Sequence, residues 1–344
     1  MNSSLWGQDS ENVTGNCSID GFKRSVYPAT YLLTFTLGLM GGAVSLCSFV
    51  SLIRTKGRLT AVNLYMLNLL VSDLMLVCSL PFRAAYYLMG SNWIFGDVTC
   101  RVISFVFYIN MYSSIYFLMV LSVMRYLAIT HPYKYVQLQS SRSSWVVCLL
   151  VWVVVSLAST PLLGAGSVQD RGHTRCLDLA KKNVDTIVKM NYASVFLGFV
   201  LPFAVISFCY VFVVHSLLKP REVRGPKRPC YRKSCALVVI VLAIFFICFL
   251  PYHVVRILFL HAEWQLTRNV YASSCHYIEG LHKAAVVTLC LAVANSCLDP
   301  LLFFFAGENF WKFCNRKGKL VPKSRNVLRK MVNMPNTELQ ELKA

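Results

Sequence analysis

Long apolar runs alternate with short polar segments along most of this chain. Seven of the runs are long enough to cross a bilayer as helices, since a span needs about 20 apolar residues. They cover residues 27–53, 61–88, 100–130, 144–166, 189–218, 235–262 and 283–306. Helices satisfy their own backbone hydrogen bonds in lipid. The pattern therefore predicts an all-α fold, a seven-transmembrane helix bundle over residues 27–306 without a separate soluble domain.

The segments that flank the spans differ from them in pattern. Residues 1–26 are polar and lack the apolar core of a cleavable signal peptide, so the first span is expected to direct insertion. Residues 307–318 have the mixed pattern of a short amphipathic helix on the membrane surface. Cys314 in that helix is either a free thiol or a palmitoylation site. Residues 319–344 are basic and polar, as expected for a cytoplasmic tail without a packed core.

The distribution of charge predicts the orientation in the membrane. The chain has 34 Lys and Arg against 15 Asp and Glu, a net charge of +19, and the excess lies mainly on the side of the C-terminus. Because cytoplasmic loops are enriched in Lys and Arg, the N-terminus is predicted outside. Glycosylation sequons at Asn2, Asn12 and Asn16 favour the same orientation. Anionic membrane lipid is a sufficient partner for the juxtamembrane charge, so no nucleic acid is expected.

Several charged side chains lie within the predicted spans. Such residues are costly in hydrocarbon and are usually functional. Asp73 and Asp299 are buried carboxylates, suited either to a cation or proton site or to polar contacts between helices. Arg83 and Arg256 lie in the outer halves of their spans. Arg125 lies near an inner end, where it either extends to the head groups or faces protein.

Tyrosines share helix faces with each other and with one of these arginines. Tyr108 and Tyr112 are four residues apart, as are Tyr252 and Arg256, so each pair lies on one face. Ordinary packing is the alternative explanation for such tyrosines. No acidic residue lies between positions 101 and 125, and an amine ligand would require one there. The pattern therefore disfavours a cationic small-molecule ligand.

The 14 cysteines do not have metal-ligand spacing. Most lie in spans, where cysteine is a small apolar residue. Cys17, Cys100, Cys176 and Cys275 lie in segments predicted to be outside, and this even number allows two disulfides of undetermined pairing. The chain has no phosphate-binding loop, metal cluster or nucleophile elbow, so we expect neither an enzyme nor an organic cofactor.

Motifs in successive spans resemble those of the rhodopsin-like (class A) G-protein-coupled receptors. The matching positions are Leu69, Asp73, Cys100, Arg125, Tyr126, Trp152, Pro202, Tyr210, Phe249, Pro251, Asp299 and Pro300. The resemblance covers residues 17–317. Within the class, stretches at 21–24, 81–97, 108–129, 245–253, 281–289 and 299–310 resemble the cysteinyl leukotriene receptors, most of all their type 2 members.

This resemblance implies a glycosylated, multi-pass receptor of the plasma membrane that binds an anionic lipid, a cysteinyl leukotriene. It further implies coupling to heterotrimeric Gq-class G-proteins and calcium release in inflammation. The implied ligand-binding residues are Lys23, Arg83, Tyr108, Tyr112, Tyr252, Arg256, His282 and Lys283. Arginine binds a carboxylate as a two-pronged fork, which suits the anionic head group. The alternatives are a nucleotide or lysophospholipid ligand and, remotely, a transporter, for which we find no internal repeat.

The resemblance also implies an ion site, a switch and two disulfides. A sodium ion would be held by Asp73, Ser114, Asn295 and Asp299, since two close carboxylates repel without a cation or proton. Residues for G-protein coupling and switching would be Arg125, Tyr126, Tyr210, Phe249, Pro251, Pro300 and Phe303. The implied disulfides are Cys100–Cys176 and Cys17–Cys275.

Four positions depart from the pattern of the class. Gly42 replaces an asparagine, Met124 an acid, Phe249 a tryptophan and Phe303 a tyrosine. Met124 removes the carboxylate restraint beside Arg125, which favours higher basal activity. Phe303 lacks the hydroxyl that joins the active-state water network, which favours lower efficacy. We therefore hypothesise an altered balance of coupling.

Overall fold

A computed structural model of the chain describes residues 19–57, 59–164, 166–170, 172–176, 184–218, 238–267 and 275–306. The described residues up to Phe305 belong to one compact unit. Several sequence predictions lie outside the described residues: Asn2, Asn12, Asn16, the Cys17–Cys275 pairing, the amphipathic helix 307–318, Cys314 and the tail 319–344.

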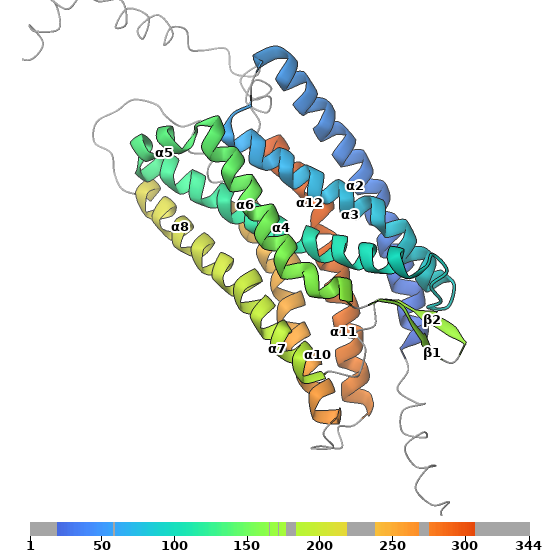
Figure 1. Ribbon diagram of the computed structural model, residues 1–344. Helices are drawn as coiled ribbons and strands as arrows, with labels where there is room; N and C mark the ends of the chain where they lie inside the picture. Colours follow the sequence, from blue (N-terminus) through green and yellow to red (C-terminus); the bar gives the residue numbers. More distant parts are fainter. Residues whose placement is uncertain are drawn as a thin grey trace, which may run out of the picture. The chain divides into compact units, whose positions relative to one another are not determined.

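Seven helices in the described part of the chain are long and apolar enough to cross a membrane, which confirms the predicted bundle. The first four are α2 (Asp20–Lys56), α3 (Ala61–Leu88), α4 (Asp97–Thr130) and α6 (Ser141–Ser159) (Figure 1). The fifth joins α7 (Val184–Val195), the π-helical η3 (Phe196–Val200) and α8 (Leu201–Leu218). The sixth contains the π-helical η4 (Phe245–Phe249) and α10 (Leu250–Thr267), and the seventh joins α11 (Cys275–Val293) and α12 (Asn295–Ala306).

The ends of these helices follow local chemistry. The hydroxyls of Thr60 and Ser140 accept from main-chain N–H groups in the first turns of α3 and α6, which satisfies donors left free at helix N-termini. Gly57 ends α2 in the left-handed conformation, with φ of 71°, as is common for glycine after a helix. The first span begins at Asp20 rather than at residue 27, so part of the predicted tail is helical.

Prolines account for the two π-helical segments. The π-helical segment η3 ends just before Pro202, which has no N–H to donate to the carbonyl of Leu197 five residues earlier. The hydroxyl of Tyr116 on α4 donates to that carbonyl instead, at 2.9 Å. The segment η4 likewise precedes Pro251. The seventh span is interrupted at Ala294, between α11 and α12.

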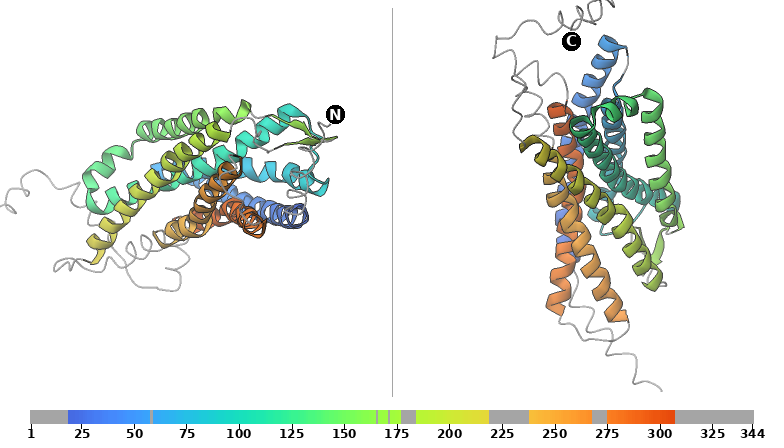
Figure 2. Two further views of the ribbon diagram at one scale, coloured as in Figure 1. Left: turned by 90° about the horizontal axis from the view of Figure 1, so that it is seen from below. Right: turned by 90° about the vertical axis from the view of Figure 1, so that its left-hand side faces the viewer.

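Neighbouring helices pack closely at glycines of α2. α2 lies against α3 and α11, while α4 contacts α3, α6 and α8 (Figure 2). A Cβ atom at Gly41 would lie 2.8 Å from the Pro300 ring, and one at Gly42 would lie 2.7 Å from the Leu74 side chain. Small residues permit such close approach of membrane helices. Gly42, one of the departures from the class pattern, thus has a packing role.

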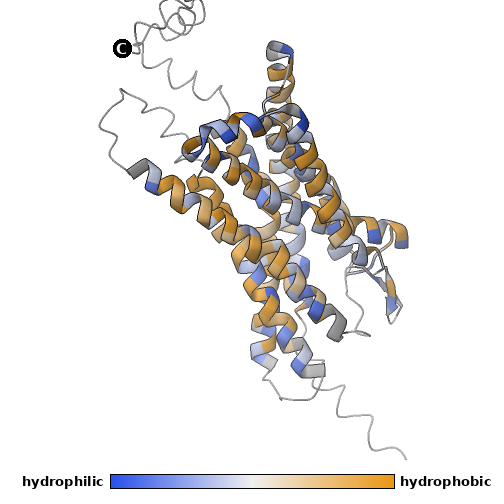
Figure 3. Ribbon diagram, turned by 60° about the vertical axis from the view of Figure 1, so that its left-hand side comes forward, coloured by the Kyte–Doolittle hydropathy of each residue, from blue (hydrophilic) through white to orange (hydrophobic). Residues whose placement is uncertain are grey.

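Apolar side chains cover the outside of the bundle as well as its interior. Figure 3 shows hydrophobic residues along the middle of the helices, including surfaces that face away from other helices. Leu33, Leu149 and Val211 are among the exposed examples. Lipid is the solvent that makes such a surface favourable.

Four short elements add to the seven spans. A helix α5 (Pro132–Leu138) follows α4, and a 3-10 turn η1 (Thr160–Gly164) ends the fourth span. Strands β1 (Val168–Asp170) and β2 (His173–Arg175) pair antiparallel, with Gln169 opposite Thr174. The strands lie between the fourth and fifth predicted spans, at 144–166 and 189–218. A disulfide joins Cys176 after β2 to Cys100 on α4, which confirms that predicted pairing.

Candidate functional site

Arg83 lies buried near the C-terminal end of α3, two residues after a helix proline. Its side chain is 4% exposed, and its guanidinium carbon lies 4.0 Å from the centre of the Phe107 ring. Such a contact is a cation–π interaction. The Nε atom of Arg83 has no hydrogen-bond partner in the described part of the chain, and the same holds for the hydroxyl of the fully buried Tyr31.

Tyrosines of α2 and α3 surround this arginine. Tyr27 stacks on Tyr31 at 5.4 Å and on Tyr87 at 4.4 Å between ring centres. All three interact electrostatically with Arg83. The sequence prediction omitted these tyrosines, although the four-residue spacing of Tyr27 and Tyr31 indicates a shared face of α2.

Arg256 on α10 lies among the tyrosines that the sequence assigned to it. It interacts electrostatically with Tyr108, Tyr252 and Tyr112, and also with Tyr27 beside Arg83. The rings of Tyr108 and Tyr112 stack at 6.5 Å. The structure therefore brings two arginines and their tyrosines into one region. Neither arginine has an ion pair with an acidic side chain in the described ranges.

Close packing from the fifth and sixth spans fixes Tyr112. Its ring occupies the place that a Cβ atom at Gly198 would take, so only glycine fits there. The ring of His253 lies 6.3 Å from Tyr112 and stacks on Phe199 at 4.4 Å. His253 Nδ1 lies 2.8 Å from the carbonyl oxygen of Phe249. The sequence prediction gave Gly198, Phe199 and His253 no role, since their contacts depend on how the helices cross.

Three further residues predicted to bind the ligand, Lys23, His282 and Lys283, have other neighbours than the two arginines. The ammonium group of Lys283 pairs with the Glu279 carboxylate at 2.5 Å, and it lies 5.9 Å above the Phe22 ring. The His282 ring lies 4.8 Å from Phe259. Lys23 is half-buried on α2. Lys283 thus already has an acidic partner, in contrast to Arg83 and Arg256.

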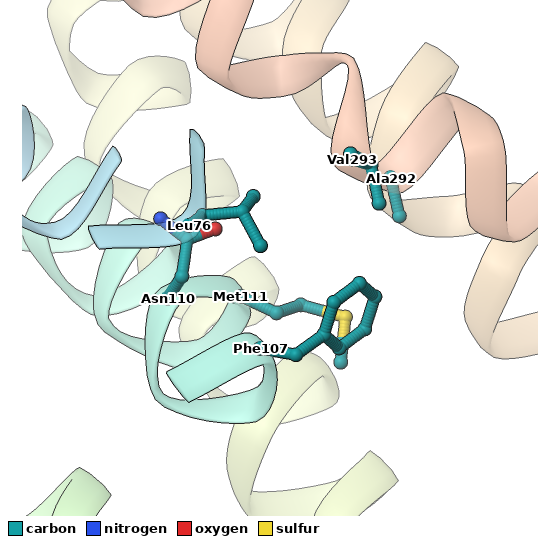
Figure 4. Close-up of a pocket in the computed structure, with 6 residues that line it drawn as sticks. All are labelled: Leu76, Phe107, Asn110, Met111, Ala292 and Val293. Atoms are coloured by element: carbon teal, nitrogen blue, oxygen red, sulfur yellow. The ribbon is translucent and has the colours of Figure 1, made fainter. Parts of the chain in front are cut away.

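A narrow hollow lies between the arginine region and a deeper polar cluster. Figure 4 shows its lining, which comes from α3, α4 and α11: Leu76, Phe107, Asn110, Met111, Ala292 and Val293. The hollow is too narrow to admit a water molecule. The Phe107 ring at this hollow contacts the Arg83 guanidinium, and Asn110 belongs to the polar cluster. The arginine region and the polar cluster therefore adjoin.

The polar cluster is built around the two predicted carboxylates, Asp73 on α3 and Asp299 on α12, which interact electrostatically. Asn110 donates from Nδ2 to Asp73 Oδ1 at 3.3 Å, and Asn295 donates to Asp299 Oδ2 at 3.5 Å. Further buried hydroxyls that the sequence prediction missed belong to Ser72, Ser113 and Ser296. Asn110 is also a missed member, and its polarity within a span was the available signal.

Three buried oxygens of this cluster have no hydrogen-bond partner within the described ranges. They are Asp73 Oδ2, Ser114 Oγ and Asp299 Oδ1, all from residues of the predicted sodium site. Oxygen ligands with two carboxylates suit a hard cation. The described residues contain no group of three or more His, Cys, Asp or Glu that could hold a metal ion.

At the end of α4 that the charge pattern predicts to be cytoplasmic, Arg125 lies near Tyr210, and its Nε atom has no partner among the described residues. The hydroxyls of Tyr210 and Ser122 are hydrogen-bonded at 2.8 Å. Phe303 packs its ring on Phe49 at 5.5 Å. The other predicted switch residues have neighbours of their own: Tyr126 packs on Phe208 and Phe212, Phe249 is fully buried beside Phe245, Pro251 follows η4, and Pro300 lies against Gly41.

Comparison with known proteins gives consistent matches over most of the chain. Residues 46–303 match the family model described as 7 transmembrane receptor (rhodopsin family). Human cysteinyl leukotriene receptor 2 is 44% identical over 304 residues, which cover 88% of this chain and 84% of that protein. Mouse cysteinyl leukotriene receptor 1 is 35% identical, covering 87% and 83%. The human uracil nucleotide/cysteinyl leukotriene receptor is 35% identical, covering 84% and 75%.

Proposed function

Because this chain belongs to the rhodopsin family of seven-transmembrane receptors, we propose that it recognises cysteinyl leukotrienes at the plasma membrane, with its N-terminus outside. Family membership makes it a multi-pass membrane receptor and not an enzyme, and it removes the transporter alternative. The proposal concerns the ligand, the G-protein class and the ion.

The observation that carries the ligand proposal is the pair of arginines without acidic partners. Arg83 is buried and Arg256 half-buried, and their described neighbours are aromatic side chains rather than carboxylates. A buried charge without a counter-ion is costly. A ligand that brings a carboxylate supplies the missing charge and binds arginine through paired hydrogen bonds. The tyrosines add hydroxyl donors and apolar faces for a lipid chain.

The names of the relatives point to the same ligand class. Two of the three carry the name cysteinyl leukotriene receptor alone, and the third is named for uracil nucleotides as well. Phosphates bind arginine by the same fork geometry. A nucleotide is therefore the second candidate ligand, favoured specifically by that relative.

Activation is proposed to shift the population toward a state in which the sixth span moves outward about η4 and Pro251. Arg125 supports this mechanism because it lies at the cytoplasmic end without an ion pair in the described part of the chain. A Gq-class G-protein and calcium release are the proposed output, as the resemblance implies.

A sodium ion is proposed at the polar cluster. Asp73, Ser114 and Asp299 offer free buried oxygens, and Asn295 bonds to Asp299 and so orients it. A bound cation would offset the repulsion between the two carboxylates. The chain's own contribution is the placement of these oxygens on α3, α4 and α12.

A competition screen tests the ligand proposal. Cells that express the receptor are exposed to cysteinyl leukotrienes, uracil nucleotides and lysophospholipids, with calcium flux as the readout and a Gq inhibitor as control. Leukotrienes are expected to be the most potent, with a response that the inhibitor removes. A response to nucleotides or lysophospholipids alone overturns the ligand assignment, and an inhibitor-resistant response overturns the G-protein assignment.

A further inference from the structure

Outside the arginine region, a charged cluster joins the first turn of α4 to the chain that leads into β1. Asp97 accepts a hydrogen bond from Nε of Arg101 at 2.7 Å. The same carboxylate accepts from the main-chain N–H and the hydroxyl of Ser167, at 2.6 Å and 2.9 Å. Arg101 also donates to the carbonyl oxygen of Leu163. Two side chains of one helical turn therefore hold the approach to the hairpin.

Asp97 and Arg101 pack closely against the chain at Gly166, just before β1. A Cβ atom at Gly166 would overlap both the Asp97 carboxylate and the Arg101 guanidinium. The two charged side chains are about four-tenths exposed, so the ion pair by itself contributes little. The strength of the contact comes instead from the charge-assisted hydrogen bonds that Ser167 donates.

The other end of the hairpin is fixed to the same part of the molecule. The disulfide joins Cys176 to Cys100, which lies one turn after Asp97 on α4. The main-chain carbonyl of Thr174 accepts a hydrogen bond from the N–H of Trp93 at 2.7 Å. The main-chain N–H of Thr174 donates to the side-chain oxygen of Asn92 at 2.9 Å. The hairpin is thus held covalently at its exit and by Asp97 and Arg101 at its entrance.

We propose that Asp97 and Arg101 are positioning residues that form a second, noncovalent anchor of the extracellular hairpin. With entrance and exit both fixed to one turn of α4, the hairpin is ordered before a ligand arrives. Binding then carries little ordering cost for this segment, and the ligand stays bound longer. The effect on ligand kinetics rests on the proposed function, whereas the anchoring does not.

Hydrogen exchange on the full-length receptor without ligand tests the anchor. In Asp97→Ala, amides of residues 167–175 are expected to exchange about tenfold faster, because Ser167 loses the carboxylate that accepts its two hydrogen bonds. The double variant Asp97→Arg, Arg101→Asp is the matched control, since it keeps an ion pair within α4 but places a donor against the Ser167 N–H. If the pair only stabilises α4, the swap restores slow exchange; if it anchors the hairpin, exchange stays fast.

Ligand dissociation is the second measurement. A labelled cysteinyl leukotriene is expected to leave both variants about fivefold faster than wild type, at equal surface expression, because the hairpin must be reordered. Unchanged exchange in Asp97→Ala, or slow exchange in the swap, overturns the anchor. Faster hydrogen exchange of the hairpin with an unchanged rate of ligand dissociation overturns the role of the anchor in ligand binding. A wild-type receptor that binds no leukotriene refutes the proposed function instead, and the exchange experiment still decides the anchor.

Discussion

Replacing Arg83 by methionine is expected to have opposite effects on ligand affinity and on the stability of the free receptor. The side chain is buried, its Nε is unpartnered, and no acidic residue in the described ranges pairs with it. In the complex, the ligand carboxylate would be its counter-ion. Removing one partner of such a buried pair costs about 2–3 kcal/mol, at the lower end of the measured range. The dissociation constant should therefore rise about 30- to 160-fold.

The free receptor should behave differently. Methionine removes a buried charge that has no counter-ion, which offsets the loss of the cation–π contact with Phe107. The melting temperature of the unliganded receptor is expected to be unchanged or higher. Saturation binding on membranes and a thermal-shift assay on purified receptor measure the two effects.

The matched control is Arg24→Met. Arg24 is an exposed arginine of α2 that donates to the carbonyl of Gly90 at 3.4 Å. Its loss should change the affinity less than about twofold, as for an ordinary surface contact. An Arg83→Met receptor that binds leukotriene within about threefold of wild type, at equal expression, refutes the assignment of Arg83. A large fall in its melting temperature refutes the view of an uncompensated charge.

Three further changes probe other parts of the molecule. Asp73→Asn should abolish any difference in agonist affinity between sodium and N-methylglucamine buffers, and a difference that persists contradicts the ion site. Gly198→Ala should displace the Tyr112 ring and weaken binding about tenfold, in line with about 1–3 kcal/mol for overpacking; wild-type affinity would show that the ring is free to move. Met124→Asp combined with Phe303→Tyr should lower basal and raise maximal inositol phosphate, and identical levels in both receptors dismiss the hypothesis of altered coupling.

The spans and the main charged positions were predictable because they stand out from their surroundings. An apolar run of span length has few alternatives to a membrane helix, and a carboxylate such as Asp73 inside one is rare enough to signal a site. The arginine region was predictable for the same reason. Arg83 and Arg256 are charges in apolar spans, and the shared face of Tyr252 and Arg256 follows from helix periodicity.

The neighbours of these residues were not predictable, because they depend on how the helices rotate and cross. Asn110 reaches Asp73 only through the contact of α4 with α3, and nothing local in the sequence specifies that contact. The interruption at Ala294 has no proline or glycine at that position to mark it. The strands of the hairpin are three residues each, too short for an alternating pattern to appear.

The contact between Gly41 and Pro300 has a consequence for how the protein is made. The glycine belongs to the first span and the proline to the last. During synthesis, the recess at Gly41 stays unfilled until the ribosome has released nearly the whole membrane domain. The first helix therefore completes its packing only after translation of the seventh, and any product that stops before residue 300 reaches the membrane with that recess open.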